Sequence, residues 1–336
     1  MKHKNIKRII HRCIEELKAT YRIAKVTSIR KAIKTFIAKI DIQIMNHNGY
    51  YENDTRKKHL INKHNIMIEY YEKTFGNFLN EYKPINNKQI KGKDMSNTIW
   101  ICWWQGLENA PDIVKKCVDS IKKHAGTHPV IILTEDNYKD YVTIPKKIED
   151  KKNAGIITRT NYSDLLRLSL LAEHGGMWID STFLCVSDEI QNYFELPLWS
   201  IKRPDYFHAS VASGYFAGYS LYCNADNRYI FATIRDFFIN YWLNNDYMVD
   251  YLMVDYMIVL AQRFDSRIKK AFEQIPSNNK NCDELFKILS SEFSQIKWEE
   301  LKDDTSLFKL TWKYKFKNKK RGKETFYQQI IGKEIE

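Results

Sequence analysis

Three ionisable side chains stand at informative positions in the segment N-Y-S-D-L-L-R-L-S-L-L-A-E-H-G-G-M-W-I-D-S-T, residues 161–182. Asp164 and Arg167 are three residues apart in a stretch with helical apolar spacing, so they share one helix face. Asp180 ends a short apolar strand that follows a Gly-Gly break. Because charged side chains are rarely buried without a partner, an acid at the end of a buried strand indicates a ligand.

A second candidate group belongs to the apolar segment Thr98–Trp104 (T-I-W-I-C-W-W), which predicts a strand. Tryptophans in such a strand are either core residues or, at the strand end, platforms for a nucleobase. Both alternatives stay open for Trp100. Gln105 and Gly106 follow directly and supply an amide and a flexible backbone.

Asp255 and Gly176 complete the set of candidate site residues. Asp255 lies among apolar residues in M-V-D-Y-L-M-V-D-Y-M-I-V-L, so we expect it to be poorly exposed and to need a partner. Gly176 lies in the Gly-Gly break, which brings the end of the helix and the strand together.

Several catalytic motifs are absent from the sequence. It holds no Walker loop and no G-x-G-x-x-G, G-x-S-x-G or H-E-x-x-H motif, which disfavours kinases, dinucleotide enzymes, serine hydrolases and zincins. The six cysteines are scattered without zinc-ligand spacing. We therefore expect reduced, mostly buried thiols, which argues against secretion.

Alternating strand and helix patterns begin near residue 97 and position these side chains. Strand, helix, strand, helix and strand are expected over residues 98–104, 110–124, 130–134, 161–174 and 177–179. This order predicts an α/β fold with a mostly parallel, doubly wound sheet. Because ligands of such sheets bind beyond the carboxyl ends of the strands, Asp180 is expected at the centre of a crevice. Further strands are expected over 198–202 and 214–219, before a largely helical C-terminal part.

The two ends of the chain carry its positive charge. Residues 1–40 hold 12 basic and 2 acidic side chains and residues 309–336 hold 9 and 3, whereas the whole chain has a net charge of +12. Isoleucine spacing over residues 5–45 predicts a basic amphipathic helix. That helix either lies on an anionic bilayer or packs on its own domain with a solvated basic face. Charge confined to the ends does not favour a nucleic-acid groove, so no nucleic-acid partner is expected.

The location of the protein is predicted from segments that the sequence lacks. It shows no signal-peptide pattern and no apolar run long enough to span a membrane. We expect a cytoplasmic protein. If residues 1–40 bind an anionic bilayer, the protein would be peripheral on the inner face of the cell membrane.

In combination, four segments resemble the bacterial capsular polysaccharide synthesis family, which is similar to glycosyltransferase family 32. They are T-I-W-I-C-W-W-Q-G-L-E-N-A-P, S-D-L-L-R-L-S-L-L-A-E-H-G-G-M-W-I-D-S-T-F-L-C, V-D-Y-L-M-V-D-Y and D-T-S-L-F-K-L-T. The resemblance covers roughly residues 97–330. It implies the glycosyltransferase-A (GT-A) fold, a Rossmann-like sheet flanked by helices, over residues 96–330. Residues 1–95 would then form a basic helical N-terminal extension.

The resemblance also implies roles for single residues. Trp100 would stack on the base of the donor, Asp164 would bind its ribose or sugar, and Arg167 would contact the sugar or its phosphates. Asp180 matches the first aspartate of the family's DxD motif, and we expect Asp180 and Asp255 to be catalytic. The nucleotide-sugar site would comprise Trp100, Gln105, Asp164, Arg167, Gly176 and Asp180.

Thr182 replaces the second aspartate of that motif, the form D-x-T that the capsular family shows. Mn²⁺ or Mg²⁺ held by Asp180 and Thr182 is the expected cofactor, but a threonine hydroxyl is a weak ligand for a hard cation. Either another residue such as Asp255 completes the metal site, or arginine and lysine side chains neutralise the diphosphate.

The resemblance implies a glycosyltransferase that moves a hexose from a nucleotide-diphosphate sugar, with UDP as the expected carrier. The acceptor would be a lipid-linked or free oligosaccharide in capsule or surface polysaccharide synthesis, and the anomeric configuration would be retained. One alternative is a nucleic-acid or anionic-surface binding protein that uses its basic termini. Another is a catalytically weakened glycan-binding relative.

Overall fold

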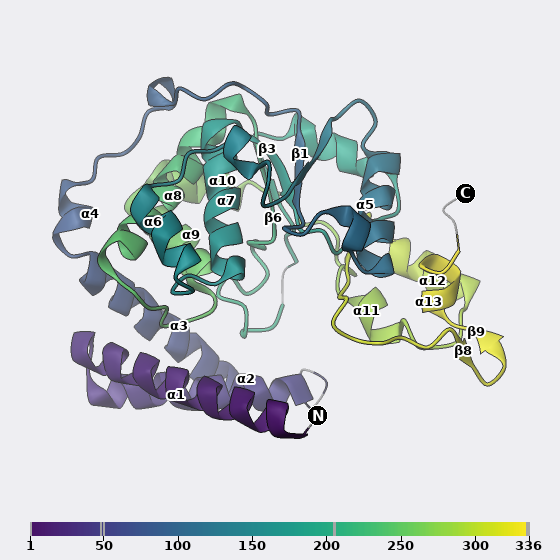
Figure 1. Cartoon of the computed structure of the whole chain (residues 1–336), viewed down its shortest axis with the longest axis horizontal. Coiled ribbons are helices and arrows are strands. Elements are labelled where there is room, and N and C mark those ends of the chain that lie inside the picture. The colour runs from purple at the N-terminus through teal and green to yellow at the C-terminus, as the bar shows by residue number, and fades with distance from the viewer. Residues whose placement is uncertain (1, 48, 50, 204–205, 334–336) are drawn as a thin grey trace.

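The computed structural model describes residues 2–47, 49, 51–203 and 206–333, with side chains from residue 13 onward. Its strands lie near the centre, with helices α6 to α10 to one side and α5 and the C-terminal helices to the other (Figure 1). The helices are α1 (Lys2–Val26), α2 (Ile29–His47), α3 (Asp54–Phe75), α4 (Asn77–Glu81), α5 (Asp112–His124), α6 (Lys146–Asn153), α7 (Arg159–Glu173), α8 (Arg228–Asn244), α9 (Met253–Phe264), α10 (Ser266–Glu273), α11 (Glu284–Ile288), α12 (Gln295–Lys302) and α13 (Phe326–Ile330). Within the described residues, no helix has the length and hydropathy to cross a membrane.

A five-stranded sheet with the order β2-β1-β3-β6-β5 forms the centre of the molecule. Its strands are β1 (Ile99–Cys102), β2 (Val130–Leu133), β3 (Gly176–Ile179), β5 (Leu198–Ser200) and β6 (Ser220–Cys223). Strand β1 pairs in parallel with β2 and β3, whereas β6 pairs antiparallel with both β3 and β5. The sheet is therefore mixed. The α/β class is confirmed, but the prediction of a mostly parallel sheet is wrong.

The connection between β5 and β6 accounts for this difference. Parallel neighbours need a crossover, usually a helix, whereas antiparallel neighbours can be joined by a loop. The described residues between β5 and β6 contain no helix, and β6 returns beside β5 in the opposite direction. The strand expected over 214–219 instead begins at Ser220, because turns occupy the preceding residues.

The two faces of the sheet pack against different helices, as the two-residue period of a strand requires. Trp100 and Trp178 lie on the face that packs with α7 and α8, in a core that includes Leu166. Ile99 and Met177 point to the other face, in a core that includes residues of α5. Burial of both faces explains why these strands read as continuous apolar runs.

A separate two-stranded sheet connects the C-terminal part to the centre. Its strands are β4 (Phe183–Cys185), which directly follows the Asp180 segment, and β7 (Leu307–Lys309). They pair antiparallel, with Phe183 opposite Lys309. This register brings a lysine from the C-terminal part next to the end of β3. A short hairpin of β8 (Lys319–Lys320) and β9 (Lys323–Glu324) follows.

Helices α1, α2 and α3 lie along the lower edge of Figure 1, with α1 and α2 outermost. The helical prediction for residues 5–45 is confirmed, with a break between α1 and α2. Helix α3 packs into the main core, where the ring centroid of Tyr71 lies 5.7 Å from that of Tyr241 and 5.6 Å from that of Tyr256. Residues 54–75 are therefore part of the folded body.

Candidate functional site

Helix α7 positions Asp164 and Arg167. The Thr158 hydroxyl caps the helix by accepting a hydrogen bond from the Asn161 backbone N–H at 3.3 Å. One turn on, Arg167 Nη2 lies 3.2 Å from Asp164 Oδ1, and both side chains are more than nine-tenths buried. This helix is buried on nearly all sides, so the pair is an internal one and not a surface ion pair.

Strand β3 delivers Asp180 to the same place. The Trp178 indole donates a hydrogen bond to Asp180 Oδ1 at 3.1 Å, and Arg167 Nη2 lies 3.6 Å from that oxygen. The guanidinium also lies 5.1 Å from the centre of the Trp178 ring and donates from Nη1 to the Gly218 carbonyl. Its Nε is buried without a hydrogen-bond partner among the described residues. An orphaned donor of this kind can bind a ligand oxygen.

Lys309 of β7 joins the candidate site, although the local sequence does not predict it there. Its Nζ donates to Asp180 Oδ2 at 2.8 Å and to the Thr182 hydroxyl at 2.9 Å. The ammonium therefore lies between the first and third positions of the D-x-T motif. A charged residue inside the apolar strand L-F-K-L was the available signal, although nothing local shows that this strand pairs with residues 183–185.

Asp255 approaches the cluster from α9. A Cβ atom added to Gly218 would lie 2.5 Å from Asp255 Oδ1 and 3.7 Å from Arg167 Nη1. Glycine at position 218 thus lets the α9 carboxylate and the α7 guanidinium come close. We call Asp164, Arg167, Asp180, Asp255 and Lys309 the Asp180 cluster.

The three carboxyl groups of the cluster differ in protonation. Burial, together with the charge of Asp164, raises the pKa of Asp255 to about 7, and burial raises the pKa of Asp164 to about 6 against the opposing charge of Arg167. Burial also acts on Asp180, but Lys309 and then Arg167 outweigh it and hold the pKa of Asp180 below its ordinary value. At neutral pH Asp180 is ionised, while Asp255 is partly protonated. Carboxyl groups with separated pKa values are typical of catalytic sites.

Three predicted site residues lie outside this cluster. Trp100 is fully buried, and its indole donates to the Gly175 carbonyl at 2.9 Å while its ring packs edge-on against Tyr141. Gly176 is at the opposite end of β3 from Asp180, and an added Cβ would lie 2.6 Å from the Thr98 carbonyl oxygen. Gln105 is exposed in the loop after β1. The structure therefore gives Trp100 and Gly176 packing roles.

The side chains around Asp180 and Thr182 bear directly on the metal site expected there. The Lys309 ammonium bonds both oxygens that would bind the ion. Among the described residues, no group of three or more histidine, cysteine, aspartate or glutamate side chains is arranged to hold a metal. The motif as folded here fits a lysine ammonium and does not fit a divalent ion.

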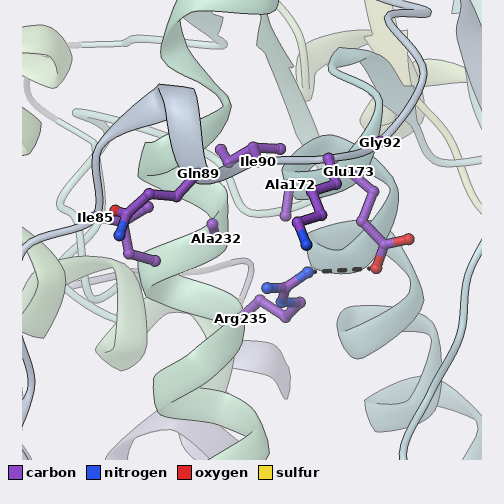
Figure 2. A pocket seen from close by; sticks show the side chains of 9 residues that line it. Ile85, Gln89, Ile90, Gly92, Ala172, Glu173, Ala232 and Arg235 are labelled. Atoms are coloured by element: carbon purple, nitrogen blue, oxygen red, sulfur yellow. Dashed lines mark hydrogen bonds and ion pairs between the residues drawn. The ribbon is translucent and has the colours of Figure 1, made fainter.

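A pocket of about 540 Å³ lies where α7 ends at Glu173. Figure 2 shows the side chains that line it. Two of its three charged side chains, Glu173 and Arg235, pair with each other at 3.3 Å, and the third, Lys91, is exposed. The charges of Glu173 and Arg235 satisfy each other, and the described residues that line the pocket include only one acid, Glu173. The Asp180 cluster, which gathers several carboxyl groups and cations, is therefore the candidate site in preference to this pocket.

Comparison with known proteins identifies the family. The family model of capsular polysaccharide synthesis proteins matches residues 46–330, so the match includes α3 as well as the sheet. A stretch of 100 residues, 27% of this chain, is 26% identical to the O-glycosyltransferase PaGT of Phomopsis amygdali and spans 25% of that protein. No solved structure matches the chain. The family match covers most of the sequence, and this chain belongs to the capsular polysaccharide synthesis protein family.

Proposed function

We propose that this protein is a glycosyltransferase with a GT-A fold that uses a nucleotide-diphosphate sugar, with UDP as carrier. It would transfer a hexose, with retention, to a lipid-linked or free oligosaccharide in capsule or surface polysaccharide synthesis. One observation carries the proposal: Asp180 ends the central strand β3 between two cations, Arg167 and Lys309. Membership of the capsular family and the similarity to an O-glycosyltransferase support it.

Each residue of the Asp180 cluster has a proposed task. Asp180 is the ionised acceptor for hydroxyl groups of the donor, and 29% of its side chain is exposed, so a ligand can reach it. Asp164 orients Arg167. The buried Arg167 Nε–H has no hydrogen-bond partner among the described residues and is proposed to donate to the sugar or diphosphate. Asp255, with its raised pKa, can donate or accept a proton near neutral pH.

Lys309 is proposed to supply the charge that a metal ion supplies in other transferases. Breaking the bond between sugar and diphosphate builds negative charge on the leaving group, and a fixed cation stabilises that charge. The Lys309 ammonium is held by Asp180 and Thr182 and is 21% exposed. The positive charge of this ammonium group would stabilise the diphosphate leaving group without a divalent ion.

Donor binding and turnover test the proposal. Isothermal titration with a panel of nucleotide-diphosphate sugars should give binding, and slow donor hydrolysis should be detectable. Asp180→Asn should lower hydrolysis by about 10²- to 10³-fold, the usual effect of removing one electrostatic contact at a reacting centre. The exposed Asp119→Asn is a matched control that should keep full activity.

The same measurements separate the alternatives. Absence of binding to every nucleotide sugar would refute the proposed function. Glycan binding without donor hydrolysis would identify a weakened relative, and salt-sensitive binding to arbitrary DNA without nucleotide-sugar affinity would identify a nucleic-acid binding protein.

A further inference from the structure

Helix α2 carries a stripe of exposed isoleucines. Ile29, Ile33, Ile37, Ile40 and Ile44 are 72%, 52%, 42%, 45% and 38% exposed. Their spacings of four, four, three and four residues put all five within an arc of about 80° on an α-helix. We call these five residues the isoleucine stripe. An apolar stripe of this kind normally faces a core, yet here it faces solvent.

The opposite face of α2 is the one that packs on the protein. Ala32, Thr35, Ala38 and Met45 are buried there, against α1 and α3. Alanines on this buried face allow the helices to approach closely. Helix α2 therefore has one largely apolar face that packs on the protein and a second apolar face, the isoleucine stripe, that faces solvent. The isoleucine stripe is therefore not needed to fold the helix bundle.

Helix α1 extends this apolar surface. Ile14, Leu17 and Tyr21 are 44%, 60% and 61% exposed, and α1 lies beside α2 along one edge of the molecule (Figure 1). In the described part of the chain, eight of the sixteen exposed large apolar side chains belong to these two helices. Concentrated exposure of this kind marks an interaction surface.

Positive charge accompanies the apolar surface. Arg30 and Lys34 each follow an isoleucine of the stripe, and both are exposed, as are Lys18 and Lys25 on α1. Residues 1–40 have a net charge of +10. A second copy of this surface would bring equal positive charge against it, whereas an anionic lipid surface is complementary in both charge and polarity.

We infer that α1 and α2 form a docking face for an anionic bilayer, with the isoleucine stripe inserted at the boundary between headgroups and acyl chains. Helices that lie in this plane combine an apolar face with flanking lysine and arginine. The inference rests on the exposed surface alone and does not depend on the proposed transferase activity.

The docking face is tied to the candidate site through one aspartate. Lys39, on the inner side of α2, donates to the Val249 carbonyl at 2.8 Å and lies 4.0 Å from Asp250. Asp250 in turn accepts from the Leu252 N–H at 3.0 Å, at the start of the helix that carries Asp255. A bilayer bound at α2 would therefore hold α9 and its carboxylate at a fixed distance from the lipid surface.

Vesicle binding tests the inference. The full chain should co-sediment with vesicles of phosphatidylcholine and phosphatidylglycerol, and only weakly with phosphatidylcholine alone. Ile33→Asp/Ile40→Asp should reduce binding by about tenfold or more, because it places two charges in the inserted stripe. The matched control is Ile156→Asp/Ile296→Asp, which charges two isoleucines that are exposed elsewhere, at 39% and 76%. This control should bind like the wild type.

A second variant separates charge from insertion and covers any loss of folding in the first. Arg30→Glu/Lys34→Glu keeps the isoleucine stripe and should also weaken binding, with a thermal unfolding midpoint close to that of the wild type. Equal binding of wild type and both α2 variants would overturn the inference. A dimer in analytical ultracentrifugation that Ile33→Asp/Ile40→Asp dissociates, without vesicle binding, would assign the surface to a second copy instead. Retention on DNA but not on vesicles would equally refute it.

Discussion

Asp255 illustrates how position alone changes the chemistry of a side chain. It lies in the first turn of α9, where burial and the charge of Asp164 outweigh the opposing charge of Arg167 and raise its pKa to about 7. Asp180, a short distance away, has Lys309 at 2.8 Å and a lowered pKa. Two residues of one type are thus prepared for two tasks, a proton carrier and a fixed anion.

The raised pKa of Asp255 predicts a pH-dependent stability. Between 3.8, its ordinary pKa, and about 7, the folded chain keeps a proton that the unfolded chain releases, so stability falls as pH rises through this range. Asp255→Asn removes this dependence and should be more stable than the wild type by about 1–3 kcal/mol at pH 8. Urea unfolding at about pH 4.5 and about pH 8, near the two ends of this pH range, checks the prediction. A difference that does not change with pH would contradict it.

Lys309 carries the prediction that transfer needs no metal ion. Wild-type donor hydrolysis should be the same in a chelator as in Mn²⁺, and Lys309→Met should lower it by about 10²- to 10³-fold. Because Lys309 holds the pKa of Asp180 down, the acidic limb of the pH–rate profile should also move to higher pH in this variant.

Lys313→Met is the matched control for Lys309→Met, since Lys313 lies four residues further along in an exposed position. It should keep wild-type hydrolysis and an unshifted acidic limb. Activity that a chelator abolishes and Mn²⁺ restores would show that the lysine does not replace a metal ion. Nucleotide-sugar binding that persists in that case would leave the proposed transferase function standing.

At the scale of elements, the site depends on two long-range attachments. The pairing of β4 with β7 brings Lys309 to the end of β3. The buried pair of Lys63 on α3 and Asp250, 2.8 Å apart, fixes the start of α9. Burial acts against ionisation of Asp250, but Lys63 and Lys39 outweigh it and lower its pKa to about 2.

Removal of Lys63 should therefore be costly. Lys63→Met leaves the Asp250 charge buried with only the more distant Lys39, so it should destabilise the fold by about 3–5 kcal/mol at pH 7 in urea unfolding. The contribution of Asp250 is present above its ordinary pKa of 3.8 and is lost as pH falls toward about 2. The double variant Lys63→Met/Asp250→Asn should recover most of the loss. A double variant no more stable than the single one would show that the charge pair is not the cause.

On the scale of the whole molecule, the basic N-terminal helices and the candidate site belong to one folded body. Helix α2 contacts the segment before α9, and α3 shares its core with α8 and α9. Docking at α2 would fix the position of the site relative to the bilayer. The isoleucine stripe itself makes no contact with the Asp180 cluster among the interactions of the described residues, so we expect docking to act on access to the acceptor and not on the chemistry of the donor.

The difference between access to the acceptor and chemistry of the donor gives a prediction for transfer at a membrane. With a lipid-linked acceptor in anionic vesicles, Ile33→Asp/Ile40→Asp should lose about tenfold or more of the transfer rate, in line with its weaker binding. Hydrolysis of soluble donor without vesicles should stay at the wild-type rate. A loss of both activities together would show that the stripe supports the fold of the site instead of docking.

Much of this arrangement could be predicted from local sequence. The helical spacing of Asp164 and Arg167, the Gly-Gly break and the strand that ends at Asp180 all appear as expected, because they belong to adjacent elements with clear periodicity. Trp100 could not be assigned in this way. A tryptophan in a strand has the same local pattern whether it faces a core or a ligand, and only the packing places it in the core.

The sequence by itself determined the family, the order of the elements and the acid at the end of β3, since these depend on motifs and on short-range periodicity. Tertiary structure alone decided three further features. It turned β6 antiparallel, brought Lys309 across 127 residues to Thr182, and turned the isoleucine stripe outward. The physical reason is common to all three. Periodicity shows which residues share a face, but strand pairing and helix packing decide what covers that face.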